Sequence, residues 1–141
     1  MPTDVVLDST AIAAIFFRDT HSEQVEATLK RFERFHTLDL AFAEVGNVAW
    51  KRINFFKEDF ATHLRALLAA TDFIRNVCNV IETREVLAQA LEVGVKEGIT
   101  IYDSLFVALA KRMKVKLLTT DEKLHDRVRK SRELNDLAFL P

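Results

Sequence analysis

Four acidic residues stand at junctions where the sequence predicts that a strand ends or a helix begins. Asp8 and Asp121 each follow a short apolar run, and Glu44 and Asp103 each fall in the first turn of a predicted helix. In a parallel sheet, ligands gather at the carboxyl ends of the strands. A helix N-terminus also favours a nearby carboxylate by about 0.3–1 kcal/mol, which helps to keep it ionised. We therefore take these four side chains as the candidate catalytic residues.

Carboxylates that are held close together indicate a metal site. Their mutual repulsion raises one or more pKa values unless a counter-ion is present. Magnesium prefers oxygen ligands and keeps several waters, and a carboxylate-bound Mg²⁺ can activate a water and stabilise charge on a phosphodiester. The chemistry indicated is metal-assisted phosphodiester hydrolysis. A lone aspartate at a helix start is more often a simple cap, and the order of the four along the chain does not by itself bring them together.

Other catalytic chemistries find little support in the chain. No serine stands in a nucleophile-elbow context, and the segment 8–10 lacks the second aspartate of haloacid-dehalogenase-type phosphatases and the paired acids of a receiver domain. The glycines form no phosphate-binding loop, and they are Gly46, Gly94 and Gly98. The histidines are scattered without zinc-ligand spacing, and they are His21, His36, His63 and His125.

The composition is that of an ordinary globular chain. Of its 141 residues, 49% are hydrophobic and 29% are charged, so we expect a single domain over residues 1–141 with its own core. The formal net charge of -1 does not by itself indicate nucleic-acid binding. A single cysteine, Cys78, excludes an intrachain disulfide and fits a reducing compartment. No apolar stretch approaches the roughly 20 residues that span a bilayer, so we expect a cytoplasmic protein without membrane contact.

Short apolar strands alternate with amphipathic helices along the chain, and these elements must position the acids. Strands are predicted at about 5–7, 37–40, 77–81, 116–119 and 137–140. Helices are predicted at 11–17, after a capping box of Thr20 and Glu23, from 41, around 60–68, at 87–95 before a Gly98 C-cap, after Thr100, and at 122–132. This alternation predicts an α/β fold in which helices cover both faces of a parallel sheet.

Four segments resemble the motifs of the PIN-domain family, in the family's order. Residues 5–12 are similar to the opening strand that delivers the first aspartate, and residues 43–50 are similar to a second motif with a glutamate and, three residues later, an asparagine. Residues 99–110 are similar to the most specific motif, in which Tyr-Asp opens a long helix, and residues 117–121 match the closing motif. The ordered set covers essentially the whole chain, with every acidic position present.

The chain length and the third motif look most like the toxins of VapBC-type toxin–antitoxin pairs. The resemblance implies a PIN-like three-layer α/β/α sandwich with many helices and a central parallel sheet in the order 3-2-1-4-5. It also implies a ribonuclease that cleaves single-stranded or loop RNA with Mg²⁺ or Mn²⁺, a homodimer, and a cognate small antitoxin as partner. Asp8 and Asp103 would bind the metal directly, and Glu44 and Asp121 would complete the cluster directly or through water. The polar neighbours that would orient ligands or water are Ser9, Asn47 and Thr119, although Ser9 and Thr119 can equally be caps or turn residues.

Two surface features each have two explanations. A local excess of cations surrounds and follows the last acidic motif, and it includes Lys111, Arg112, Lys114, Lys116, Lys123, Arg127, Arg129, Lys130 and Arg132. These residues can hold an RNA backbone, or they can form a solvated helix face. The run 53–60 is rich in phenylalanine. Core packing is the simpler explanation, and a groove for a dimer partner or an antitoxin is the alternative.

The function also stays open between classes of protein. A housekeeping RNA-processing nuclease or an exonuclease would carry the same site as a toxin. A PIN scaffold that has lost its activity would act as a binding module. The complete set of acids favours an active nuclease.

Overall fold

The structure, a computed structural model, describes residues 3–139 and 141 of the chain. Its strands are β1 (Asp4–Leu7), β2 (Arg34–Leu38), β3 (Cys78–Ile81), β4 (Lys116–Leu118) and β5 (Ala138–Phe139). Its α-helices are α1 (Ser9–Phe16), α2 (Ser22–Leu29), α3 (Leu40–Asn54), α4 (Phe60–Asn76), α5 (Leu87–Glu97), α6 (Ile101–Met113) and α7 (Glu122–Lys130), with a short 3₁₀ turn at Thr83–Glu85. Position 140, the expected end of the last strand, lies outside the described residues.

The strands form one parallel sheet in the order β3-β2-β1-β4-β5, which confirms the order that the family resemblance implies. Strand β1 lies at the centre, where Val5 is paired with Phe35 of β2 and with Lys116 of β4. Val5, Val6 and Leu7 are completely buried. A parallel strand covered on both faces needs apolar residues at every position, which explains the unbroken run that identified β1 in the sequence.

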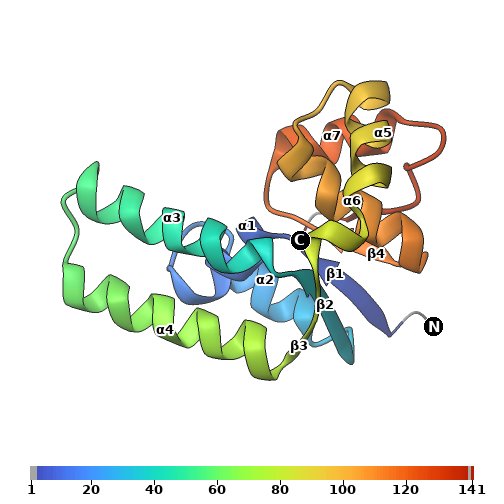
Figure 1. The fold of residues 1–141 in the computed structure, drawn as a ribbon. Helices are drawn as coiled ribbons and strands as arrows, with labels where there is room; N and C mark the ends of the chain where they lie inside the picture. The colour runs from blue at the N-terminus through green and yellow to red at the C-terminus, as the bar shows by residue number, and fades with distance from the viewer. Residues whose placement is uncertain (1–2, 140) are drawn as a thin grey trace.

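Helices cover both faces of the sheet and complete the three layers. Helices α1 to α4 pack beside one another, and α5, α6 and α7 form a second group near β1 and β4 (Figure 1). Helix α6 contacts β1, β2 and β4, and its residues 104–110 are all buried. A helix that is apolar on all sides belongs in the core, so α6 is a fixed support for the residues at its N-terminus. None of the helices in the described part of the chain is long and apolar enough to cross a membrane.

Helices α3 and α4 form an arm that extends beyond the sheet (Figure 1). They are 15 and 17 residues long, and their connection lies at the end of the arm. Phe55, Phe56 and Phe60 at this end are 64%, 70% and 62% exposed. Core packing is therefore the wrong explanation for this phenylalanine run, because no other layer reaches the end of the arm.

Three local predictions need correction. Glu44 lies in the second turn of α3, because the helix begins at Leu40. Helix α2 begins at Ser22 and has no side-chain cap, so Thr20 does not open a capping box. The spacing of Val25, Leu29, Phe32 and Phe35 predicts one apolar helical face that includes Phe35, but Phe35 belongs to β2 instead.

Candidate metal site

Asp8 is held at the junction between β1 and α1. It is the N-cap of α1, and its Oδ1 accepts the backbone N–H of Ala11 at 3.0 Å and the hydroxyl of Thr10 at 2.7 Å. The side chain is almost fully buried, with 3% of the residue exposed. Burial raises the pKa of Asp8 to about 6, against hydrogen bonds from Thr119 and Thr10 that lower it. The chain therefore holds a carboxylate in a place where its charge is costly without a cation.

A network of threonine hydroxyls joins the ends of β1 and β4. The backbone N–H of Thr120 donates to Thr10 Oγ1 at 3.0 Å, and that oxygen lies 3.2 Å from Thr119 Oγ1. The backbone N–H of Asp121 in turn donates to Thr119 Oγ1 at 3.0 Å. The same Thr10 hydroxyl binds Asp8. This network fixes the distance between the loop that carries Asp8 and the loop that carries Asp121.

Glu44 reaches the same edge of the sheet from α3. Ser9 Oγ donates a hydrogen bond to Glu44 Oε1 at 2.6 Å, which ties the second turn of α3 to the first turn of α1. Burial raises the pKa of Glu44, the Ser9 hydrogen bond opposes this, and the charge of Asp103 adds to it. Ser9 is itself buried and Glu44 is half-buried, so the contact is partly shielded from water.

Asp103 lies at the electrostatic centre of the four acids. Its backbone N–H donates to Oγ1 of Thr100, the N-cap of α6, at 3.2 Å, as the sequence predicted. Burial raises the pKa of Asp103, the charge of Asp121 raises it further, and a hydrogen bond with Thr100 lowers it. The charge of Asp103 in turn raises the pKa values of Asp8 and Glu44. Repulsion therefore links all four predicted site residues through Asp103.

Asp121 is held as tightly as Asp8. It is the N-cap of α7, and its Oδ1 accepts the backbone N–H groups of Lys123 and Leu124 at 3.0 and 3.1 Å. Capping therefore occupies one oxygen of this carboxylate and fixes its orientation. Asp121 is therefore a helix cap, and its charge acts on Asp103, so the cap hydrogen bonds do not exclude a role in the site.

The four acids have no cation of their own. None of the ion pairs formed among the described residues includes any of them. In residues 3–139 and 141, no three acidic, histidine or cysteine side chains come close enough together to enclose a metal ion. Mg²⁺ does not need such a cage, because it is usually bound by one or two carboxylates and keeps several waters. The donor set therefore fits a hydrated divalent ion held by two acids, with the others reached through water.

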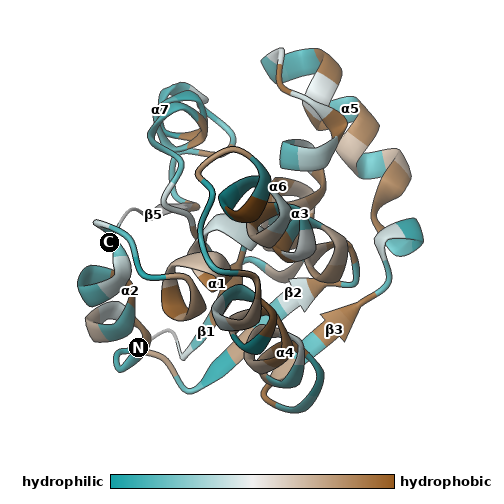
Figure 2. Ribbon diagram, turned by 90° about the vertical axis from the view of Figure 1, so that its left-hand side faces the viewer, coloured by the Kyte–Doolittle hydropathy of each residue, from teal (hydrophilic) through white to brown (hydrophobic). Residues whose placement is uncertain are grey.

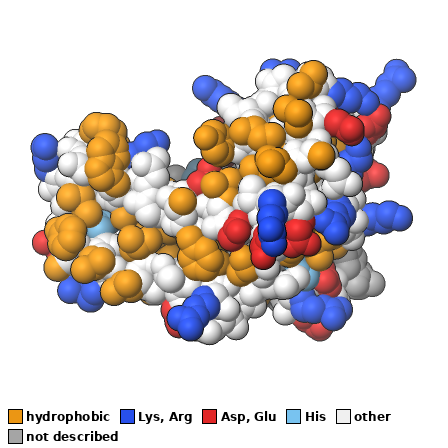
Figure 3. Space-filling model, viewed as in Figure 1, with side chains coloured by type: hydrophobic (Ala, Val, Ile, Leu, Met, Phe, Trp, Pro, Cys, Tyr) orange, Lys and Arg blue, Asp and Glu red, His pale blue; other side chains and the backbone are white. Residues whose placement is uncertain are grey.

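The surface is hollowed between the α3–α4 arm and the group formed by α5, α6 and α7. Figure 3 shows this hollow from one face, with acidic atoms in red at its floor. Of the predicted polar neighbours, Ser9 and Thr119 make the hydrogen bonds described above, whereas Asn47 is exposed on α3. The structure adds Thr10, which sequence reasoning missed. Its signal in the sequence is that hydroxyl residues follow the apolar run at both strand ends, at 9–10 and 119–120.

Comparison with known proteins assigns the chain to a family. The family model of the PIN domain matches residues 5–130. The chain belongs to the PIN-domain family. Among curated relatives, this PIN domain is 38% identical over 125 residues to Ribonuclease VapC3 of Pyrobaculum aerophilum, which covers 87% of the chain and 93% of that relative. It is 26% identical over 126 residues to Exonuclease VapC9 of the same organism, covering 88% of the chain and 85% of that relative.

Solved structures share the fold of this PIN domain. The crystal structure of PAE2754 from Pyrobaculum aerophilum matches with a TM-score of 0.67 at 23% identity, over 89% of this chain and 79% of that one. VapBC2 from Rickettsia felis, bound to a DNA fragment from its promoter, matches with a TM-score of 0.58 at 14% identity, over 98% and 97% of the two chains. At these identities the likeness extends to the fold.

Proposed function

We propose that this PIN domain is a metal-dependent ribonuclease that hydrolyses phosphodiester bonds of single-stranded or loop RNA. The observation that carries the proposal is the linkage of four acids from four elements through Asp103, without a partner cation among the described residues. Such a site is stable only with a divalent ion or with raised pKa values. The name of the relative with 38% identity, Ribonuclease VapC3, supports RNA as the substrate.

The roles of the four acids follow from how each is held. When bound, Mg²⁺ or Mn²⁺ supplies a Lewis acid and an activated water. Asp8 and Asp103 are the proposed direct ligands, as the family resemblance implies, and burial raises the pKa of each. Glu44 and Asp121 complete the cluster directly or through water, with one oxygen of each held by the chain. The hydroxyls of Ser9 and Thr10 keep Glu44 and Asp8 in place as the substrate enters and leaves.

We further propose that the chain is a toxin that a small antitoxin inhibits, and that it forms a homodimer. The VapBC2 neighbour supports a protein partner. The end of the α3–α4 arm exposes apolar side chains that a partner can cover, with the rings of Trp50 and Phe55 packed edge to face at 5.1 Å. Light scattering at micromolar concentrations should give the mass of a dimer. A monomer at every concentration would contradict the dimer and leave the nuclease proposal intact.

Two cleavage modes have support among the relatives. The name Ribonuclease VapC3 does not say whether cleavage is internal or from an end, whereas the name Exonuclease VapC9 indicates cleavage from an end. A circular single-stranded RNA separates them, because only an endonuclease can open it. Opening of the circle would show an endonuclease, and an intact circle beside a degraded linear RNA would show an exonuclease.

A cleavage assay tests the proposed function. Wild-type protein is incubated with unstructured and hairpin RNA in EDTA, and then with Mg²⁺ or Mn²⁺ restored. We expect no cleavage in EDTA, recovery with either ion, and a preference for unpaired RNA. Full activity in EDTA would contradict the metal mechanism. No activity under any condition, from a protein that binds RNA, would favour the inactive scaffold.

A further inference from the structure

Helix α7 carries three cations on one face. Lys123, Arg127 and Lys130 follow one another at spacings of four and three residues, so they share a side of the helix. We call these three residues the α7 strip. The helix is almost entirely hydrophilic in Figure 2 apart from the turns that bear the buried Leu124 and Val128. Packing therefore accounts for two residues of α7 and leaves the α7 strip unexplained.

The α7 strip lines a separate hollow of about 720 Å³, which is not the one between the α3–α4 arm and the group formed by α5, α6 and α7. The remaining residues of its lining are Glu97, Asp126 and Ser131, and Ser131 Oγ donates to Glu97 Oε1 at 3.0 Å. The hydrogen bond joins the end of α7 to the end of α5. Its lining therefore comes from two elements that are fixed to each other.

Two segments connect the lining of the hollow to residues of the acidic cluster. Lys123 is two residues from Asp121, whose carboxylate accepts its backbone N–H. On the other side, Arg127 Nη1 lies 3.9 Å from where a Cβ on Gly98 would stand. Gly98 caps α5 with a φ of 67°, a left-handed conformation that favours glycine, and the chain then runs directly into α6 and Asp103. The α7 strip therefore begins two residues after Asp121, and its Arg127 lies near Gly98, from which the chain leads to Asp103.

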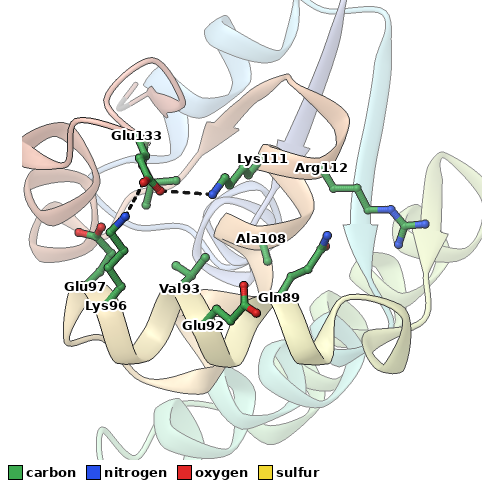
Figure 4. A pocket seen from close by; sticks show the side chains of 10 residues that line it. Gln89, Glu92, Val93, Lys96, Glu97, Ala108, Lys111, Arg112 and Glu133 are labelled. Carbon is green, nitrogen blue, oxygen red and sulfur yellow. Dashed lines mark hydrogen bonds and ion pairs between the residues drawn. The ribbon is translucent and has the colours of Figure 1, made fainter.

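The charges of the α7 strip are available to a ligand. Figure 4 shows the contrasting case in a neighbouring pocket, where Lys96 and Lys111 both point at Glu133 and pair with it. Among the ion pairs of the described residues, none includes Lys123, Arg127 or Lys130. The lining holds these three cations against two acids, Glu97 and Asp126, so its charge is positive where the net charge of the chain is -1. The hollow therefore offers a polyanion a local attraction that the whole chain does not.

We propose that the α7 strip holds the phosphates of a single RNA strand next to the bond that is cleaved. The inference rests on the proposed function and assigns the path of its substrate. The rise of an α-helix places Lys123 and Arg127 about 6 Å apart along α7, and Arg127 and Lys130 about 4.5 Å apart. These flexible side chains can therefore contact adjacent phosphates of one strand. An acidic peptide would also match the charge of the α7 strip. RNA is the proposed ligand because an RNA strand that enters the proposed metal site from this side must cross the α7 strip.

The test compares two double variants that each remove two positive charges. Arg127→Ala/Lys130→Ala removes cations that line the hollow, whereas Arg129→Ala/Arg132→Ala removes exposed cations of the same region that do not line it. Both are placed in an inactive Asp103→Asn background. The affinity for a fluorescent unstructured RNA is measured by anisotropy at several KCl concentrations and one Mg²⁺ concentration. Circular dichroism melting of each variant identifies any that has lost its fold.

We expect the α7-strip variant to bind RNA at least tenfold more weakly, with a log–log salt slope lower by about 1.4 for two lost phosphate contacts on a single strand. The Arg129→Ala/Arg132→Ala control should keep the salt slope of the Asp103→Asn protein. An unchanged slope in the α7-strip variant, or equal changes in both variants, would overturn the inference. The cleavage assay uses wild-type protein, which has Asp103, and tests the proposed function separately. The proposed RNA path can therefore fail while the nuclease proposal stands, and the reverse.

Discussion

Thr10 donates a hydrogen bond from its hydroxyl to Oδ1 of Asp8 at 2.7 Å, and the oxygen of that hydroxyl, Thr10 Oγ1, accepts the backbone N–H of Thr120 at 3.0 Å. A hydrogen bond to a charged group contributes about 1.5–3 kcal/mol. Thr10 therefore both stabilises an ionised, buried carboxylate and holds the two strand ends together. We assign it as a positioning residue for the proposed metal ligand.

Thr10→Val should weaken Mn²⁺ binding by about tenfold and lower the free energy of unfolding by about 1–3 kcal/mol, because valine keeps the shape of threonine and loses both hydrogen bonds. Thr10→Ser keeps the hydroxyl and should bind Mn²⁺ like the wild type. Calorimetric titration measures the affinity, and urea unfolding measures the stability. Equal affinities for the valine and serine variants would show that the hydroxyl does not position Asp8.

Asp8→Asn should stabilise the metal-free protein near neutral pH. Burial raises the pKa of Asp8 to about 6. For a carboxyl group with a raised pKa, the contribution to stability is fully present below its ordinary pKa of about 4 and is lost as the pH rises through about 6. We expect the variant to unfold like the wild type near pH 4. At about pH 7.5 it should be more stable by about 1–3 kcal/mol.

Urea unfolding of both proteins in EDTA between about pH 4 and pH 8 measures this difference, and addition of Mg²⁺ provides the control. The ion should stabilise the wild type and leave Asp8→Asn largely unchanged. A stability difference that does not change with pH would contradict the assignment, as would near wild-type cleavage by the Asp8→Asn variant.

Ser9→Ala should lower kcat through Glu44 alone. The Ser9 hydroxyl holds Glu44 Oε1 at 2.6 Å, and its loss should reduce kcat by about tenfold, equivalent to about 1.4 kcal/mol. A double-mutant cycle with Glu44→Ala isolates the interaction, because glutamine would keep an oxygen that accepts the Ser9 hydroxyl. In the Glu44→Ala background, Ser9→Ala should add little further loss. Independent, additive losses in the cycle would show that Ser9 acts on something other than Glu44.

Sequence patterns predicted the fold because its physical causes are local. The central strand β1 is buried on both faces, and its apolar run is visible without any tertiary information. The threonine cap at Thr100 and the glycine at Gly98 also lie where residue type predicts them. The prediction was wrong at α2, because the helical spacing of apolar residues continued into β2. It was also wrong at the end of the arm, because α3 and α4 extend beyond the sheet and leave the phenylalanines exposed.

The candidate site was predictable in its residues but not in its geometry. Asp8, Asp103 and Asp121 lie at helix starts as predicted, whereas Glu44 lies one turn further into its helix. Parallel strands bring their carboxyl ends to one edge, which made these positions candidates. That Asp103 interacts with the other three, and that a single Thr10 hydroxyl links two loops, depends on side-chain positions that no periodicity encodes. The same limit applies to α7, where the sequence gives the charges but only the structure separates Arg127 from Arg129.

Direct binding of Mn²⁺ to wild-type protein, Asp103→Asn and Asp72→Asn is the measurement that tests the acidic cluster most directly. Asp72 is an exposed acid on α4 that accepts a hydrogen bond from Asn76, so its variant controls for the loss of one negative charge. Electron paramagnetic resonance titration reports the bound ion without any RNA. We expect wild type and Asp72→Asn to bind Mn²⁺ alike, and Asp103→Asn to bind at least tenfold more weakly while remaining folded. Equal Mn²⁺ binding by all three proteins would contradict the assignment of a metal site to Asp8, Glu44, Asp103 and Asp121.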